Sequence, residues 1–175
     1  MPVKEFNTPY PVIDSDPHFS RVVRYMRPSD YAAWAAGTAA APALLLGMAL
    51  NYSYIHVYLE KMDPAGPLRN LRLPLRIATV VGAFGGFLYA YQTSSLRFWG
   101  WTENSAEVAK DQAELSQLAK EGKALYGESY MPEHVQDASA RNSRYSQLKF
   151  GAIPWFNFAN HNNHGVDTSK YSESS

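Results

Sequence analysis

The stretch YAAWAAGTAAAPALLLGMALNYSYIHVYL, residues 31–59, contains no Lys, Arg, Asp or Glu. A second charge-free stretch, IATVVGAFGGFLYAYQTSSL, follows at residues 77–96. Charge-free apolar runs of about twenty residues are typical of helices that span a bilayer, whereas a helix on the surface of a soluble protein carries a polar face. We therefore expect an all-α membrane protein with a two-helix transmembrane hairpin at residues 31–96, whose spans cover about 31–56 and 73–96.

Polar segments flank the predicted hairpin. Residues 1–20 contain four prolines, so we expect residues 1–30 to form an extended N-terminal segment. Residues 97–175 form a hydrophilic C-terminal extension that is mostly irregular, except for one surface helix at about 103–126. Asn104 and Glu107 fit a capping box at the start of that helix. One apolar stripe should dock on a surface, and its members are Val108, Leu115, Leu118 and Leu125.

The second span ends in a polar run, Gln92, Thr93, Ser94 and Ser95. Amide and hydroxyl groups next to lipid need protein partners, because hydrocarbon offers no hydrogen bonds. We therefore expect this end of the span to pack against another polypeptide.

Small side chains recur at every fourth position of each span, and so share one face of each helix. They are Ala35, Ala39, Ala43 and Gly47 in the first span, and Ala78, Gly82, Gly86 and Ala90 in the second. Helices in lipid associate through close backbone approach, which small residues permit. The second stripe, with its GxxxG step, predicts tight helix packing. The two stripes could face each other, face partner helices, or reflect composition alone.

The composition excludes several functional classes. The chain has 16 basic and 16 acidic residues and a formal net charge of zero, so it lacks the basic surface of a nucleic-acid-binding protein. It contains no cysteine, which excludes thiolate metal sites and a cysteine nucleophile. The two charge-free stretches hold no acidic residue, lysine or arginine that could relay protons or bind ions. We expect no catalytic residues and no small-molecule substrate.

Two groups of polar residues match metal ligands only in part. Asp14, Asp16 and His18 are close in sequence but lie in a proline-rich segment without fixed geometry, which favours turn-forming aspartates. His161 and His164 could share one helical face, but no third ligand accompanies them. We therefore predict neither a metal site nor a cofactor in this chain.

An aromatic island, Ile153 to Phe158, interrupts the polar C-terminal extension. Trp155, Phe156 and Phe158 are residue types that dominate interface hot spots. Two interpretations stay open, an anchor in the groove of a partner protein and a tail that touches lipid headgroups.

The N-terminal stretch TPYPVIDSDPHFSRVVRYMRPSDYAAW, residues 8–34, resembles the accessory membrane subunit of about 21 kDa in fungal and plant respiratory complex I, the NADH:ubiquinone oxidoreductase. The two spans and the island around PWFNF agree with that family. The resemblance covers about residues 8–100 well and the rest more loosely. It implies a supernumerary subunit of the mitochondrial inner membrane, with two spans and no redox centre. No cleaved presequence is evident at the N-terminus.

The same resemblance implies a role in assembling or stabilising the membrane arm by helix packing and lipid contact. Its partners would be membrane-arm subunits and membrane lipids, with phospholipid or cardiolipin as the only bound molecule. Arg69, Arg72 and Arg76 are candidate ligands for lipid headgroups, although they could instead only signal topology. The alternative functions are an independent two-span scaffold or assembly factor and, less favoured, a small homo-oligomeric transporter.

Overall fold

The computed structural model describes residues 7–59, 71–145 and 156–172, and for residues 52–59 only the backbone. The described residues form helices and no strand, which confirms the all-α prediction. The elements are α1 (Phe19–Arg24), α2 (Pro28–Leu59), α3 (Arg72–Phe98), α4 (Ser105–Lys120), α5 (Glu133–Ser143) and the 3₁₀ turn η2 (Ser169–Tyr171). They belong to two compact units. We call Arg27–Ala90 the hairpin unit, and Met1–Met26 with Tyr91–Ser175 the terminal unit.

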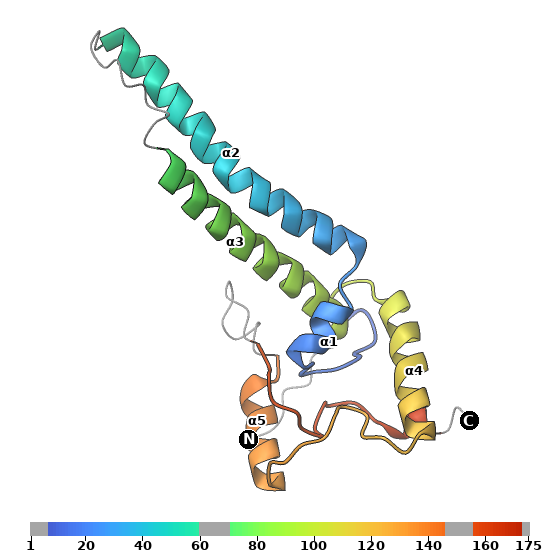
Figure 1. Cartoon of the computed structure of the whole chain (residues 1–175). Helices are drawn as coiled ribbons and strands as arrows, with labels where there is room; N and C mark the ends of the chain where they lie inside the picture. Colours follow the sequence, from blue (N-terminus) through green and yellow to red (C-terminus); the bar gives the residue numbers. More distant parts are fainter. Residues whose placement is uncertain (1–6, 60–70, 146–155, 173–175) are drawn as a thin grey trace. The chain divides into compact units, whose positions relative to one another are not determined.

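The hairpin unit consists of α2 and the larger part of α3, which pack side by side (Figure 1). Both helices are long and apolar enough to cross a membrane, over Pro28–Asn51 and Arg72–Phe98. Helix α2 begins with Pro28 in the first helical position, where a missing N–H is not needed. The Asp30 carboxylate then accepts a hydrogen bond from the Arg27 N–H at 2.7 Å, which caps the helix.

The two helices of the hairpin approach each other most closely at glycines of α3. A Cβ atom built on Gly82 would lie 2.7 Å from the Gly37 carbonyl oxygen, and one on Gly86 would lie 2.7 Å from the Trp34 carbonyl oxygen. The Trp34 indole also donates a hydrogen bond to the Ala83 carbonyl, at 2.8 Å. These distances leave room for hydrogen only, so each glycine permits backbone contact that any side chain would prevent.

The small residues of the first span lie on a different face from this contact. Ala35, Ala39, Ala43 and Gly47 are all exposed on α2. Of the three interpretations of the stripes, mutual contact is therefore excluded, because α3 meets α2 at Trp34, Gly37 and Ala41 instead.

The C-terminal turns of α3 belong to the terminal unit, where the N-terminal segment covers them. Ser94 and Ser95 are buried, and the Ser94 hydroxyl donates to the Val22 carbonyl of α1 at 2.9 Å. We expected another polypeptide to cover these serines. That expectation is wrong, because the N-terminal segment of the same chain, which precedes α2, packs against the end of α3. This packing needs Gly100, whose φ is +71° and whose Cβ, if present, would lie 2.2 Å from the Tyr10 carbonyl oxygen.

Helix α4 turns a charged face inward. Its buried residues include Glu107, Asp111 and Leu115, spaced by four. Of the apolar stripe expected from the sequence only Leu115 is buried, and the other three members are half-buried. The predicted capping box is also wrong. Asn104 makes no cap hydrogen bond, because its amide donates to the carbonyl oxygens of Pro11 and Arg97 instead.

Helix α5 lies in a region that we expected to be irregular. It begins after Pro132, whose carbonyl accepts from the N–H groups of Val135 and Gln136. Only Ala140 and Ser143 of this helix are buried. A helix with so small a buried face has almost no apolar periodicity, which is why the sequence does not reveal it.

Candidate functional site

The terminal unit contains a concentration of buried ionisable side chains, which we call the terminal ion network. Its members are Asp14, Asp16, Arg21, Asp111, His161 and His164. They come from the N-terminal segment, α1, α4 and the C-terminal segment, so residues about 150 positions apart meet at one place. Charged side chains are rarely buried unless they are paired, and in this network each member has a partner.

The first half of the network is built around Arg21. Its Nη1 donates to Asp14 Oδ2 at 2.8 Å, and its Nη2 forms an ion pair with Asp111. The Tyr171 hydroxyl, in η2, donates to the other oxygen of Asp111 at 2.6 Å. The guanidinium carbon also lies 5.4 Å from the centre of the Tyr126 ring, a distance suited to cation–π attraction. Arg21 therefore joins α1 to α4 and, through Asp111, to η2.

The second half of the network consists of two histidine–aspartate pairs. His164 Nδ1 lies 2.7 Å from Asp14 Oδ1, and His164 Nε2 lies 2.7 Å from the His161 carbonyl oxygen. Both ring nitrogens of His164 therefore face hydrogen-bond acceptors. His161 differs, because its Nδ1 accepts from the Asn163 N–H while its Nε2 lies 2.7 Å from Asp16 Oδ2.

The environment moves the pKa values of the two aspartates around Arg21 in opposite directions. Burial alone would raise the pKa of Asp14, but the charges of His164 and Arg21 and several hydrogen bonds outweigh it, so the pKa is lowered. At Asp111, burial outweighs Arg21 and Tyr171, and the pKa is raised. Burial and the hydrogen bond to Asp111 raise the pKa of Tyr171, which keeps its hydroxyl protonated as a donor.

This geometry links the two ends of the chain. Within residues 7–59, 71–145 and 156–172, no three His, Asp or Glu side chains are placed to hold one metal ion. Asp14 forms a turn as expected, since its carboxylate accepts from the Asp16 N–H at 2.9 Å. Both aspartates also bond to histidines, Asp14 to His164 and Asp16 to His161. His18 does not join them, since its ring accepts from the Ser20 N–H and caps α1. The chemistry that the network supports is electrostatic cross-linking.

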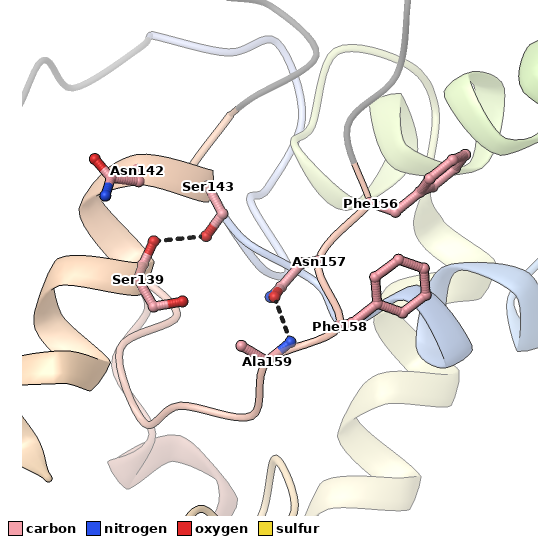
Figure 2. Close-up of a pocket in the computed structure, with 7 residues that line it drawn as sticks. All are labelled: Ser139, Asn142, Ser143, Phe156, Asn157, Phe158 and Ala159. Carbon is pink, nitrogen blue, oxygen red and sulfur yellow. Dashed lines mark hydrogen bonds between the residues drawn. The ribbon is translucent and has the colours of Figure 1, made fainter. Parts of the chain in front are cut away.

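A hollow of about 680 Å³ adjoins the network at Ser143. Figure 2 shows that polar side chains of α5 face it from one side and the aromatic island from the other. Its lining residues are Ser139, Asn142, Ser143, Phe156, Asn157, Phe158 and Ala159. The Asn157 side chain donates to the Asp16 carbonyl at 3.2 Å, so the island is tied to the N-terminal segment beside the network.

Two family models together match most of the chain. The model of the NADH-ubiquinone oxidoreductase complex I, 21 kDa subunit, matches residues 7–103, and that of the C-terminal part of the same subunit matches residues 112–175. The chain belongs to this 21 kDa subunit family. A curated relative, the NADH-ubiquinone oxidoreductase 20.9 kDa subunit of Neurospora crassa, is 51% identical over 169 residues, which cover 96% of this chain and 84% of the relative.

Membership of the 21 kDa subunit family confirms the resemblance drawn from residues 8–34. It also extends the match to the C-terminal segment, where the resemblance was looser. The terminal ion network joins the two matched regions, because Asp14 and Asp16 belong to the first and His164 and His161 to the second. The parts of the first matched region that lie outside the hairpin unit therefore fold together with the second matched region in the terminal unit.

The structure places the predicted site residues in separate parts of the molecule. Gly82, Gly86 and Ala90 are buried in the hairpin unit and Ala78 is half-buried. Arg72 and Arg76 are exposed in the first turns of α3, and Arg69 lies outside the described residues. Trp155 also lies outside the described residues.

The other two island residues differ from each other. Phe156 is half-buried and packs against Phe19 and Tyr91, whereas Phe158 is 66% exposed.

Sequence reasoning missed Arg21, Asp111 and Tyr171. A charged residue on a short helix usually faces solvent, and nothing in the local sequence distinguishes Arg21 from exposed Arg24. The one signal was on α4, where Glu107 and Asp111 are four positions apart and so share the face that Leu115 continues.

Proposed function

We propose that the chain is a non-catalytic accessory subunit of mitochondrial respiratory complex I. It stabilises or helps to assemble the membrane arm from within the inner membrane, by helix packing and lipid contact. The family supports its place in complex I, since the named relatives are subunits of that enzyme.

The observation that carries the proposal is the pair of outward apolar faces on the hairpin unit. Leu44 and Met48 of α2, and Val80 and Phe84 of α3, are all more than half exposed. An exposed apolar surface of this size is unfavourable in water but suits lipid or neighbouring apolar helices. A packed hairpin with such faces can add two helices to a membrane assembly without breaking the contacts between α2 and α3.

The small-residue stripe of α2 gives this role a specific contact surface. Ala35 and Ala39 are exposed and line a shallow apolar groove with Trp34, Thr38 and Pro42. A partner helix could approach the backbone closely along that stripe, since small side chains leave room for it. We propose that Arg72 and Arg76 bind lipid phosphates at the start of α3.

Complementation tests the assembly role. In cells that lack the endogenous chain, native electrophoresis should detect less intact complex I, and the wild-type chain should restore it. Ala39→Leu, which fills the exposed stripe, should restore it less well than the matched Leu44→Ala change on the same helix, which keeps the stripe open. If the wild-type chain migrates only as free protein, the proposal is wrong. If it migrates with partial assemblies but leaves the finished complex, it is an assembly factor.

Lipid contact has its own test. Mass spectrometry of complex I purified with Arg72→Gln and Arg76→Gln together should detect less bound cardiolipin than the wild type. Arg24→Gln, an exposed arginine of the terminal unit, serves as the control and should leave the lipid content unchanged. Equal cardiolipin in all three preparations would count against the two arginines as lipid ligands.

A further inference from the structure

Four aromatic rings gather where α3 enters the terminal unit. Tyr91 of α3 is only 2% exposed. The Phe19 ring stacks on it with 5.6 Å between ring centres, and the Phe156 ring meets it edge-on at 4.8 Å. The Phe158 ring lies 5.0 Å from Phe19. We call this group of rings the exit cluster. Tyr91 is its buried member, and Phe158, which is 66% exposed, is its exposed member.

Helix α3 determines the depth of the exit cluster in a membrane. The apolar part of the helix ends at Tyr91, and a few residues later Ser94 and Ser95 bury their hydroxyls in the terminal unit. Because a helix rises about 1.5 Å per residue, Tyr91 lies within about one turn of the hydrocarbon boundary of a bilayer that α3 crosses. Two ring-to-ring contacts, through Phe19, connect Tyr91 to Phe158 and hold Phe158 near this end of α3.

The surroundings of Phe158 suit a lipid interface. The sequence from Phe150 to Val166 contains no Lys, Arg, Asp or Glu. Phe158 lines the same hollow as Asn142 and Ser139 of α5, which offer amide and hydroxyl groups. In Figure 2 the Phe158 ring points away from α5. Phe is among the side chains that surface-bound segments bury at the boundary between headgroups and acyl chains, while polar groups beside it stay in water.

We propose that the exit cluster docks on the lipid headgroup region, with the Phe158 ring inserted at the edge of the hydrocarbon. The terminal unit would then be anchored to the membrane twice, through α3 and through Phe158. This inference rests on the proposed function, because it requires α3 to span a membrane. We favour lipid over a partner protein on this surface, because the exit cluster is attached to α3 at the point where that helix would leave the membrane.

Site-directed spin labelling tests the inference directly, since the chain has no native cysteine. Single nitroxides are attached to Phe158→Cys, Leu44→Cys and Tyr130→Cys in the full chain, reconstituted in phosphatidylcholine vesicles. Leu44 is 68% exposed on α2, and Tyr130 is 95% exposed before the start of α5, at the opposite end of that helix from the hollow. The collision rates of each label with oxygen and with a water-soluble nickel chelate report its depth.

The expected order is deep at Leu44, intermediate at Phe158 and aqueous at Tyr130. At Phe158, oxygen collisions should exceed nickel collisions, whereas the ratio should be reversed at Tyr130. Ala159→Cys, which leaves the Phe158 ring in place, should repeat the intermediate depth if Phe158→Cys disturbs folding. Far-UV circular dichroism checks the helical content of every variant.

Two results would overturn the inference, and they can be distinguished. If Leu44 is deep but both Phe158 and Ala159 are aqueous, the anchor is wrong while the membrane hairpin stands. If Leu44 is also aqueous, the proposed function fails as well. A Phe158 label that is aqueous in vesicles and inaccessible to both reagents in intact complex I would assign the surface to a partner protein.

Discussion

Gly82 and Gly85 occupy the same helix, three positions apart, and an alanine at each should have opposite effects on the hairpin unit. A Cβ atom on Gly82 would lie 2.7 Å from the Gly37 carbonyl oxygen and 2.8 Å from the Ala41 Cβ. A Cβ atom on Gly85 would meet nothing within 4 Å. Neither glycine has a positive φ, so both backbones accept alanine.

The two substitutions share one favourable effect and differ in one cost. Replacing a helical glycine with alanine stabilises a helix by about 0.5–1 kcal/mol, because the unfolded chain loses conformational freedom. At Gly85 nothing opposes this gain. At Gly82 the new methyl group meets backbone, which cannot rotate away, and such overpacking costs roughly 1–3 kcal/mol. We therefore expect Gly85→Ala to be more stable than the wild type and Gly82→Ala to be less stable, by up to about 2.5 kcal/mol once the gain is subtracted from the cost.

Titration with a denaturing detergent measures the difference. The purified full chain in mild micelles is titrated with sodium dodecyl sulfate, and far-UV circular dichroism follows the loss of helix. A spin–spin distance between labelled cysteines at Leu44 and Val80, both exposed on the hairpin unit, reports whether α2 and α3 separate. Gly82→Ala should unfold at a lower detergent fraction and lengthen or broaden that distance. Gly85→Ala should do neither.

Equal stability of the two variants, with the same interhelical distance, would refute the reasoning. It would mean that the backbones of α2 and α3 are not in contact at Gly82. Gly47→Ala on α2 serves as a second control, because a Cβ there also meets nothing within 4 Å.

Three further predictions concern the terminal ion network. Arg21→Gln should destabilise the terminal unit by about 3–5 kcal/mol in urea unfolding, because it removes the buried cation that pairs with both Asp14 and Asp111. Exposed Arg24→Gln should cost less than about 1 kcal/mol, and equal costs would contradict the ion pairing. The lowered pKa of Asp14 means that its carboxylate contributes stability that is complete above its ordinary pKa of 3.8 and is lost as the pH falls through the lowered value. Acid unfolding of Asp14→Asn, followed by near-UV circular dichroism, should therefore depend less on pH than that of the wild type. The raised pKa of Tyr171 means that its contribution is complete below its ordinary pKa of 10.0 and is lost as the pH rises beyond it. Tyr171→Phe should cost about 1–3 kcal/mol at neutral pH in urea unfolding, and should lose less stability than the wild type when the pH is raised; a steeper loss would argue against the bond to Asp111.

Much of the hairpin unit could be predicted from the sequence, because the helices depend on local composition. A charge-free run identifies a helix suited to lipid from its residue types alone, whatever the position of that helix in the fold. The GxxxG step at Gly82 and Gly86 likewise predicts tight packing without reference to the rest of the molecule. The face of α2 that contacts these two glycines could not be predicted, because α2 carries small residues on more than one side. Only the structure distinguishes Gly37, in contact with α3, from the exposed Ala39.

The terminal unit was far less predictable. Helix α5 buries only Ala140 and Ser143, and α4 buries two charged residues, Glu107 and Asp111, on the same face as Leu115. The turn formed by Asp14 is visible in the local sequence, because its carboxylate accepts from the Asp16 N–H, but the histidine partners of Asp14 and Asp16 are not. A charged side chain is assigned to solvent until its counter-charge is found. Only the pair of Asp14 and Arg21 is close in sequence, and the other charged partners of the network lie 90 or more positions apart.

From the sequence alone follow the all-α class, the pair of membrane-type helices and the resemblance to the complex I subunit, since each depends on residue types in order along the chain. The tertiary structure alone decided which residues hold the two ends together. His164 meets Asp14, and His161 meets Asp16, across about 150 and 145 positions. The strength of an ion pair depends on the distance between the charges in space and on their exclusion from water. Neither can be predicted from the periodicity of the local sequence.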